Sequence, residues 1–343
     1  MIRKMLVVAA AAAATLAVSQ PAAAEDVKLG TLAPKASIWG AVFNAWAKAV
    51  ETESNGALKL TWYYNSTQGD EIAMIGKMRG GQLDGGAFTA TGLSQIYPSI
   101  IALQMPGLFP DWAKLDKVRN STSKMFSDAF AVAGCPGGTA APTCGFKLMG
   151  TGDVGIAHIM SRDAAVRTPD QVKAMNPFSL PGDAIGKHFL RAVGAAGAKT
   201  IAVPAILPAL SSRAEGAPRM INTPALAAEQ LQWASQLNHI NTNASGIGIG
   251  ALVMTNKRFN ELPEDARAVL KKTGQNTGQL LTTRIRAADA AAFNRLKASK
   301  TVVDLNDAEK AKWNAVFQQV REALKREGDI KGDVYDAVVK AAQ

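Results

Sequence analysis

The feature that most constrains the fold is an alternation of strand and helix patterns in the first third of the chain. Residues 27–32, 58–64 and 85–91 have the alternating or apolar character of short strands. Between them, residues 38–52 and 71–79 carry apolar side chains near helical spacing. Strands that alternate with helices usually form a parallel sheet with crossover helices. We therefore predict an α/β fold.

The rest of the chain continues this pattern with a larger share of helix. We predict further strands at residues 146–150, 156–161, 178–180, 199–203 and 250–256. We predict helices at residues 111–133, 183–193, 224–237, 307–327 and 333–342, with one long or broken helix at 263–298. A chain of this length exceeds what one hydrophobic core usually organises, so two lobes are expected. We assign the parts as follows: 25–150 mainly to a first α/β lobe, 151–256 mainly to a second α/β lobe with a crossover, and 257–343 to long hinge-spanning and C-terminal helices.

Residues 1–24 have the pattern of a secretory signal peptide. Arg3 and Lys4 precede an apolar run, and Ala22–Ala24 resembles a small-residue cleavage site. A membrane anchor is the alternative, but the run is short for a spanning helix, which needs about 20 residues. We expect an exported, periplasmic protein that is cleaved near Ala24, so that the mature chain begins near Glu25.

The charge pattern argues against a nucleic-acid partner. The formal net charge is +10, but Lys and Arg alternate with Asp and Glu along the late helices instead of forming a basic stripe with interleaved aromatics. A basic surface can still attract an anionic ligand or an acidic partner. We expect a monomer.

The two cysteines, Cys135 and Cys144, flank a loop rich in Gly and Pro. In an exported protein this spacing favours a disulfide that holds the loop. A two-thiolate metal site is an alternative, although no histidine lies nearby and the short ligand spacing of zinc sites is absent. Two unpaired thiols are the other alternative.

Residues 168–182 form the candidate ligand-binding stretch. Thr168 can cap a helix, and Pro169 suits the first helical turn. The helix should be short, because Pro177 disfavours helical geometry at the residue before it. A brief strand centred on Ser179 follows, and a Pro-Gly pair ends it. Ligand sites of α/β proteins lie at such strand ends.

Catalytic motifs are scarce in this sequence. It contains no nucleophile elbow, phosphate loop or paired-histidine helix motif. The glycines of residues 246–250 do not fit a dinucleotide fingerprint, and we predict no cofactor. The three histidines are far apart in sequence, which disfavours a three-histidine metal site. We expect His158 to be a core or cleft residue and His188 to lie on the surface or in helix packing.

Seven segments, in order, resemble DctP-type substrate-binding proteins of TRAP (tripartite ATP-independent periplasmic) transporters. They are LGTLAPKASIWGAVFNAWAKAVETESNGALKL, TQGDEIAMIGKMRGGQLDGGAFTATG, YPSIIALQMPGLFPDWAKLDKV, RDAAVRTPDQVKAMNPFSLPGD, INTPALAAEQLQ, LNHINTN and FNELPEDARAVLKK. The resemblance covers most of the chain after residue 24. It implies a two-lobe fold of the type II periplasmic-binding-protein class, with a hinge, a long helix that spans both lobes and a C-terminal helical segment. It also implies a cleft ligand, usually a small organic acid, and a TRAP-type membrane permease as partner.

This sequence departs from the family pattern at the positions that usually recognise a carboxylate. The usual anchor is an arginine in a K-G-x-K-I-R-V-P pattern, because a guanidinium holds a carboxylate through two parallel hydrogen bonds. Alignment of Leu180 and Pro181 with V-P places Ser179 at that arginine. Ala157 occupies the place of a second family arginine, and Ile206 that of a frequent aromatic. The usual V-D-G reads Pro218-Arg219-Met220.

A carboxylate buried without its cationic partner is costly, so we predict a ligand that is less anionic or more apolar than a dicarboxylate. The ligand would be lipid-like or a neutral organic molecule. The predicted apolar walls are Trp39, Phe88, Phe178 and Ile206. The predicted neutral hydrogen-bonding groups are Thr89, Thr91, Ser179, Asn222 and Thr223. The set of candidate binding residues also includes Gln68, Ala157 and Arg219.

Three other functions remain open at this point. A conventional carboxylate-binding protein could use a relocated arginine, Arg213 or Arg219. An exported enzyme on the same fold could use Asp153, His158 or His239, although no base–nucleophile pair is readable in the sequence. A sensor or scaffold could carry a closed, unused cleft. Binding without turnover is the function that we predict.

Overall fold

The computed structural model describes residues 24–343 of the chain. The predicted signal peptide, residues 1–24, lies outside the described residues apart from Ala24. Within residues 24–343, no helix combines the length and the apolar character needed to cross a membrane.

The main sheet confirms the predicted α/β class. The strands of this sheet are β1 (Glu25–Thr31), β2 (Leu58–Tyr63), β3 (Gly85–Thr89), β4 (Phe146–Ser161), β7 (Met220–Pro224), β8 (His239–Thr255) and β9 (Thr301–Val303). Their spatial order is β2-β1-β3-β8-β4-β7, and β9 pairs with β8. The first three strands are parallel, as the crossover helices between them require. By contrast, β8 runs antiparallel to both β3 and β4.

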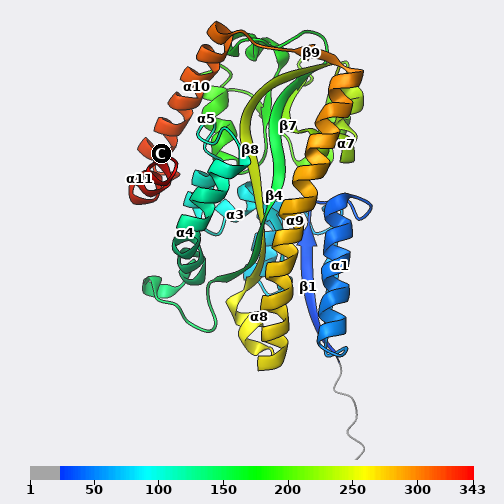
Figure 1. Cartoon of the computed structure of the whole chain (residues 1–343), viewed down its shortest axis with the longest axis vertical. Helices are drawn as coiled ribbons and strands as arrows, with labels where there is room; N and C mark the ends of the chain where they lie inside the picture. Colours follow the sequence, from blue (N-terminus) through cyan, green and yellow to red (C-terminus); the bar gives the residue numbers. More distant parts are fainter. Residues whose placement is uncertain (1–23) are drawn as a thin grey trace, which may run out of the picture.

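The long strands β4 and β8 run through both lobes of the molecule (Figure 1). Strand β1 and helix α1 (Ile38–Glu53) belong to one lobe, and β7 and α7 (Ala225–Gln230) belong to the other (Figure 1). The sequence predicted two short strands, 146–150 and 156–161, where the chain forms the single strand β4. The prediction was wrong because bulges at Leu148/Gly150 and Asp153/Gly155 break the alternation that marks a strand. The predicted boundary at residue 150 therefore falls inside one continuous strand, and the lobe boundaries stay a prediction.

One helix connects the two lobes, as predicted. Helix α9 (Glu264–Ser299) is continuous over 36 residues and runs alongside the long strands (Figure 1). It packs against β4, α1 and α7. Trp46 of α1 donates an indole N–H hydrogen bond to Thr273 Oγ1 of α9 at 3.0 Å. Asp289, further along α9, accepts hydrogen bonds from the backbone N–H groups of Ile156 in β4 and Leu226 in α7, at 2.8 and 2.9 Å.

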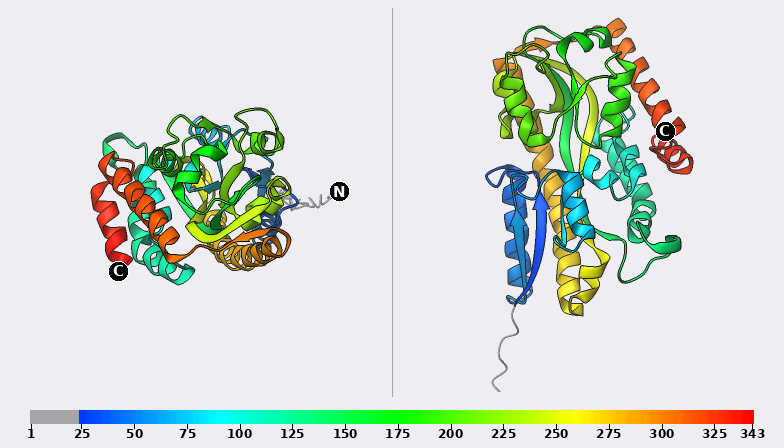
Figure 2. Two further views of the ribbon diagram at one scale, coloured as in Figure 1. Left: turned by 90° about the horizontal axis from the view of Figure 1, so that it is seen from above. Right: turned by 180° about the vertical axis from the view of Figure 1, so that it is seen from behind.

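The remaining elements surround this frame. They are α2 (Glu71–Arg79), α3 (Ala90–Ser94), α4 (Trp112–Val132), α5 (Ala184–Ala192), α6 (Val203–Ser211), α8 (Asn256–Glu261), α10 (Asp307–Arg326), α11 (Gly332–Ala341), the strand pair β5 (Phe178–Ser179) and β6 (Lys199–Thr200), and short 3-10 turns. Helices α4, α10 and α11 lie on the opposite side of the long strands from α1 and α9 (Figure 2).

The core is divided by the sheet. Along β8, Ile249, Ala251 and Val253 belong to one cluster of buried apolar side chains. The alternate residues Leu252 and Met254 belong to a second cluster. Because successive side chains of a strand point to opposite faces, both faces of β8 are buried.

Several predicted elements differ in type or extent. The strand predicted at 199–203 is only Lys199–Thr200, because Val203 begins helix α6, which the sequence analysis missed. The helix predicted at 224–237 is divided into α7 and a 3-10 turn by Gln232, whose φ is 61°. The strand predicted to reach Thr91 ends at Thr89, and α3 starts at Ala90. The strand predicted at 250–256 is the end of the longer β8.

The disulfide prediction is confirmed. Cys135 and Cys144 are bonded and close the loop between α4 and β4. His158 is buried as expected: its Nδ1 lies 3.1 Å from Asn241 O, its ring stacks on Phe293, and burial lowers its pKa to about 4. His188 is also buried and packs α5 against the segment after α10, where its Nε2 lies 2.7 Å from Asp329 Oδ2.

Candidate functional site

The candidate site is a cavity of about 360 Å³. One side is formed by the β1–α1 connection, β3 and α3, and the other by β5, α5, α6 and β7. The central parts of β4 and β8 complete it. Residues of both lobes therefore surround the same space, as expected for a hinged ligand cleft.

Ten of the twelve predicted binding residues line this cavity. They are Trp39, Phe88, Thr89, Thr91, Ala157, Phe178, Ser179, Ile206, Asn222 and Thr223. The structure thus brings together residues that the sequence places up to 184 positions apart, since Trp39 and Thr223 share one cavity. Their contact with a ligand stays a prediction.

The other two predicted binding residues lie outside the lining. The side chain of Gln68 accepts a hydrogen bond from Lys77 Nζ at 2.8 Å. The guanidinium of Arg219 donates to Ala174 O and lies 3.7 Å from Asp163. Arg213, the other arginine considered for a carboxylate ligand, is exposed and is also not part of the lining. Neither arginine therefore supplies positive charge to the cavity wall.

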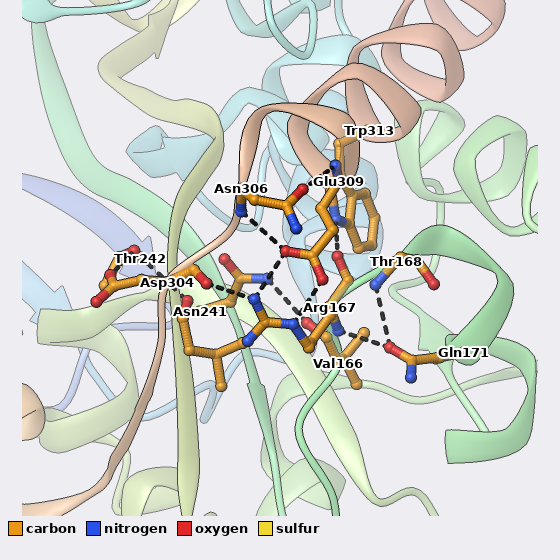
Figure 3. Close-up of polar contacts among 11 residues, drawn as sticks. Val166, Arg167, Thr168, Gln171, Asn241, Thr242, Asp304, Asn306, Glu309 and Trp313 are labelled. Atoms are coloured by element: carbon orange, nitrogen blue, oxygen red, sulfur yellow. Dashed lines mark hydrogen bonds and ion pairs between the residues drawn. The ribbon is translucent and has the colours of Figure 1, made fainter.

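A network of polar contacts holds the candidate binding stretch in place (Figure 3). The guanidinium of Arg167 donates to both carboxylate oxygens of Glu309, at 2.6 and 2.7 Å, and to Asp304 O. The indole N–H of Trp313 donates to Arg167 O at 2.8 Å. The amide of Asn241 donates to the carbonyl of the preceding residue, Val166. The start of the stretch is thereby fixed to α10 and β8.

The helix predicted at the start of this stretch is a pair of 3-10 turns, Pro169–Gln171 and Lys173–Met175. They end at Asn176 in the left-handed conformation, with φ at 48°. The chain then enters β5, which pairs in parallel with β6, and Ser179 O accepts a hydrogen bond from Ile201 N at 2.9 Å. This pairing holds Ser179 at the cavity wall, where its side chain is half-buried.

The charge of the lining is unusual for a site that binds acids. Among the lining residues of the described chain, none is Lys, Arg or His, whereas Glu71, Asp153 and Asp183 are acidic. The neutral polar side chains of the lining are Thr31, Thr89, Thr91, Gln104, Ser179, Asn222, Thr223 and Ser245. The rest of the lining is apolar or glycine, as in most small-molecule sites.

Glu71 is a structural acid of the β3–α3 turn. Its Oε1 accepts a hydrogen bond from Thr89 N at 2.6 Å, and its Oε2 accepts from Thr89 Oγ1 at 2.7 Å and Gly92 N at 2.9 Å. Burial raises the pKa of this carboxyl, and the three hydrogen bonds oppose that shift. The hydroxyl proton of Thr89 is engaged here, so Thr89 can offer a ligand only an acceptor.

Asp153 is neutralised by arginines that lie behind the cavity wall. One carboxylate oxygen pairs with Arg119 of α4, and the other accepts from Arg286 Nε of α9 at 2.6 Å. Arg286 also donates to both oxygens of Asp116, at 2.6 and 2.7 Å, and lies 4.4 Å from the ring centroid of Trp112. These contacts lower the pKa of Asp116, chiefly through the hydrogen bond with Arg286. Asp153 therefore tethers β4 to α4 and α9.

Asp183 is the third acid, and its contacts are few. It caps the N-terminus of α5, where its Oδ1 accepts a hydrogen bond from Gly186 N at 2.9 Å. Burial raises the pKa of this carboxyl. Within residues 24–343, no Lys, Arg or His lies at ion-pair distance from it.

Two amide side chains of the lining, those of Asn222 and Gln104, have NH2 groups without a protein partner among the described residues. Asn222 Oδ1 accepts a hydrogen bond from Ser245 Oγ at 2.7 Å, and Gln104 Oε1 accepts from Ile249 N at 2.7 Å. Their NH2 groups, in the part of the chain that the structure describes, donate to no protein acceptor. A ligand carbonyl or hydroxyl could accept these hydrogen bonds.

Sequence reasoning missed Glu71, Gln104, Asp183 and Ser245 as parts of the lining. Glu71 and Asp183 stand at helix starts, where acidic residues are ordinary. Ser245 and Gln104 reach the cavity only because β8 and the 3-10 turn Pro98–Gln104 pass behind it. Their local sequence carries no signal for a site.

Comparisons with known proteins agree with this architecture. The family model described as "Bacterial extracellular solute-binding protein, family 7" (DctP) matches residues 29–327. A TRAP periplasmic solute-binding protein from Ralstonia eutropha H16, with bound (S)-2-acetolactate, superposes with a TM-score of 0.80 at 18% identity, covering 92% of this chain and 98% of that one. An extracytoplasmic solute receptor from Bordetella pertussis that binds pyroglutamic acid gives a TM-score of 0.80 at 15% identity, covering 93% and 99%.

A third solved structure, a TRAP periplasmic solute-binding protein from Roseobacter denitrificans with bound β-D-glucuronate, has a TM-score of 0.78 at 15% identity and covers 92% of this chain and 99% of that one. At these identities the three structures establish the two-lobe fold. The family match extends over most of the chain and includes the strands and helices that form the cavity. The chain therefore belongs to the DctP family of bacterial extracellular solute-binding proteins, family 7.

Proposed function

We propose that the protein is the periplasmic receptor of a TRAP-type transporter and that it binds a small organic ligand less anionic than the acids held by its structural relatives. The observation that carries this proposal is the composition of the cavity wall. Within the described residues that wall contains no Lys, Arg or His, and Ser179 stands where the family arginine is expected. The ligand would be delivered to a membrane permease without chemical change.

A free carboxylate would be poorly accommodated in this cavity. It would lose its hydration without gaining a guanidinium, which is the arrangement that makes burial of a charge costly. It would also approach Asp183, which has no cationic partner among residues 24–343. Two like charges about 4 Å apart repel by about 4 kcal/mol at an effective dielectric constant of about 20. That penalty exceeds the contribution of one neutral hydrogen bond, about 1 kcal/mol.

An apolar or amphipathic ligand would gain from the same wall. Trp39 and Phe178 are half-buried side chains on opposite sides of the cavity. The NH2 groups of Asn222 and Gln104 would orient one carbonyl or hydroxyl of the ligand. A few placed polar groups in a mainly apolar wall is the composition of sites for such molecules. The acids named for the three relatives fit this wall less well.

A thermal-shift comparison tests the proposal. We expect neutral amphipathic compounds, such as phenylbutanamide, to raise the melting temperature, and succinate and glucuronate to leave it unchanged. A ligand present at about 100 times its dissociation constant stabilises the folded state by about 2.7 kcal/mol, which for a chain of this size is a shift of several degrees. Mass spectrometry of the molecule that co-purifies with the protein gives an independent reading of its charge.

The opposite pattern would refute the proposal. If succinate or glucuronate raised the melting temperature strongly and neutral compounds did not, the cavity would bind acids although no cationic side chain lies in its described lining. The relocated-arginine alternative, through Arg213 or Arg219, would then be favoured. Loss of the acid response in Arg213→Ala or Arg219→Ala would identify which arginine is used.

A further inference from the structure

Asp183 is a cavity-lining carboxylate without a counter-ion among residues 24–343. It is half-buried and borders the cavity at the start of α5. Its carboxylate interacts with two backbone N–H groups at the start of α5, those of Gly186 (2.9 Å from Oδ1) and Ile185, and no side chain of the described residues donates a hydrogen bond to either oxygen. A buried or half-buried carboxylate normally has a cation or several donors beside it. The missing partner of Asp183 points to a ligand.

The other two acids of the lining do not share this property. Asp153 has a guanidinium on each carboxylate oxygen, from Arg119 and Arg286. Glu71 has three donors, all from the β3–α3 turn that it stabilises. Asp183 is therefore the acid of the described lining with capacity left for a ligand.

The position of Asp183 also excludes an anion at this end of the cavity. A helix N-terminus usually attracts anions through its unpaired N–H groups. At α5 the carboxylate of Asp183 already occupies that place. The end of α5 that borders the cavity therefore presents negative charge instead of free N–H donors.

The neighbouring wall suits a cation with an apolar body. Phe178 precedes Ser179 on β5, and Phe189 lies two turns along α5; both line the cavity. Aromatic faces attract organic cations, and proteins recognise quaternary ammonium groups through such faces. No Lys, Arg or His of the described lining competes for Asp183.

We propose that the ligand is an organic amine with an apolar body, a protonated or quaternary ammonium, whose nitrogen is held by the carboxylate of Asp183. This inference rests on the proposed function, because it names the chemical class of the solute that the same cavity binds. Asp183 is then the residue that determines specificity. The NH2 groups of Asn222 and Gln104 would donate to a carbonyl or hydroxyl of a ligand that carries one.

Matched probes test this assignment by isothermal titration calorimetry on the mature protein. Phenylbutylamine, phenylbutyltrimethylammonium, phenylbutanamide and phenylbutanoate share one apolar body and differ in head-group charge. The variant Asp183→Asn removes the charge but keeps a helix-capping side chain, because Asn caps as well as Asp. The control variant is Asp111→Asn: Asp111 caps α4 by accepting a similar hydrogen bond from Lys114 N at 2.8 Å, and it is exposed outside the cavity lining.

We expect the wild-type protein to bind both cations more tightly than the amide, and the amide more tightly than the acid. Asp183→Asn should weaken cation binding about tenfold or more, which corresponds to about 1.4 kcal/mol, leave the amide unchanged and improve the acid. Asp111→Asn should change none of the four affinities.

Two results would overturn the inference while leaving the proposed function intact. One is amide binding as tight as cation binding in the wild type, with the acid excluded. The other is cation binding that Asp183→Asn does not weaken. Absence of saturable cation binding up to millimolar concentration would also overturn it. Tightest binding of the acid by the wild-type protein would instead refute the proposed function itself.

Discussion

Replacement of Ser179 by an arginine would return to the cavity the cation that its family relatives are expected to use. Ser179 and Asp183 lie close to the same point beside Gly186: a Cβ atom placed on Gly186 would lie 3.5 Å from Ser179 Cβ and would overlap Asp183 Oδ2. An arginine at position 179 would therefore reach both the cavity and Asp183. The new guanidinium has two competing partners, the ligand and this carboxylate.

The expected magnitudes follow from that competition. A charge-assisted pair between an arginine and a carboxylate contributes about 1.5–3 kcal/mol, which is about 10–150-fold in affinity. In Ser179→Arg alone, Asp183 would hold the guanidinium, so affinity for phenylbutanoate should rise only a few-fold. In the double variant Ser179→Arg/Asp183→Asn the full increase should appear. Both variants should lose phenylbutylamine binding, because the cavity becomes positive or neutral.

Calorimetry of the wild type, the two single variants and the double variant completes a double-mutant cycle. Ser123→Arg, on the exposed face of α4 and outside the cavity lining, introduces the same charge away from the site and should change neither affinity. Unchanged binding of both probes in Ser179→Arg would mean that Ser179 does not face the ligand. Additive effects of the two substitutions would refute the proposed pairing between the introduced guanidinium and Asp183.

Three further predictions concern stability, and denaturant unfolding measures each. Cys135→Ser should lower the free energy of unfolding by about 2–3 kcal/mol, because the disulfide closes a short loop in the unfolded chain; an unchanged midpoint would contradict this. Asp289→Ala should cost about 2–4 kcal/mol, because it leaves the half-buried N–H of Ile156 and the buried N–H of Leu226 without an acceptor; a cost no larger than that of an ordinary surface substitution would contradict this. Because burial raises the pKa of Asp183 above its ordinary 3.8, the wild type loses stability as pH rises through that raised pKa. Asp183→Asn should therefore gain stability relative to the wild type as the pH rises from 3.8 towards neutrality, and a constant difference would contradict the shift.

The elements predicted well from the sequence are those whose local signals agree. Helix α1 has a Ser37 cap that accepts a hydrogen bond from Gly40 N, and its buried residues recur at helical spacing. Helix α2 has Asp70 as its cap and basic residues in its last turn. In α1 the cap agrees with the periodicity, and in α2 the cap agrees with the charges at the two ends of the helix. No long-range contact had to be known.

The elements predicted poorly are those in which tertiary contacts override local preference. Helix α6 contains Pro208 inside the helix and begins with Val203, both unfavourable signals. It forms because Ile206 and Leu210 are buried in the core, each 1% exposed. Strand β4 contains Gly152, Asp153 and Gly155, which are poor strand formers. The strand continues through these residues because it pairs with β8 along this stretch.

The site was predictable only as far as the family pattern reached. Ser179 and Asn222 line the cavity, and they were predicted from the order of the segments that resemble the family; their contact with a ligand stays a prediction. Asp183 was not found, because an Asp before a helix is explained by capping alone. Asp183 also lacks a cationic partner among the described residues, and this depends on which side chains of the rest of the fold lie near it. That information is not in the local sequence.

The replacement at position 179 and the acid at position 183 have to be considered together. Loss of an arginine alone would leave a cavity that is merely less able to hold an acid, and a neutral amide or alcohol would suit it. With Asp183 near position 179, a serine at that position leaves the Asp183 carboxylate without a counter-ion among residues 24–343. An arginine at position 179 could pair with the Asp183 carboxylate or with a ligand carboxylate. These two acids would compete for the one guanidinium. Under the proposed function, Ser179 and Asp183 would together select against acids in two ways, because an attraction is missing and a repulsion is present. We therefore expect that both substitutions are needed to reverse that specificity.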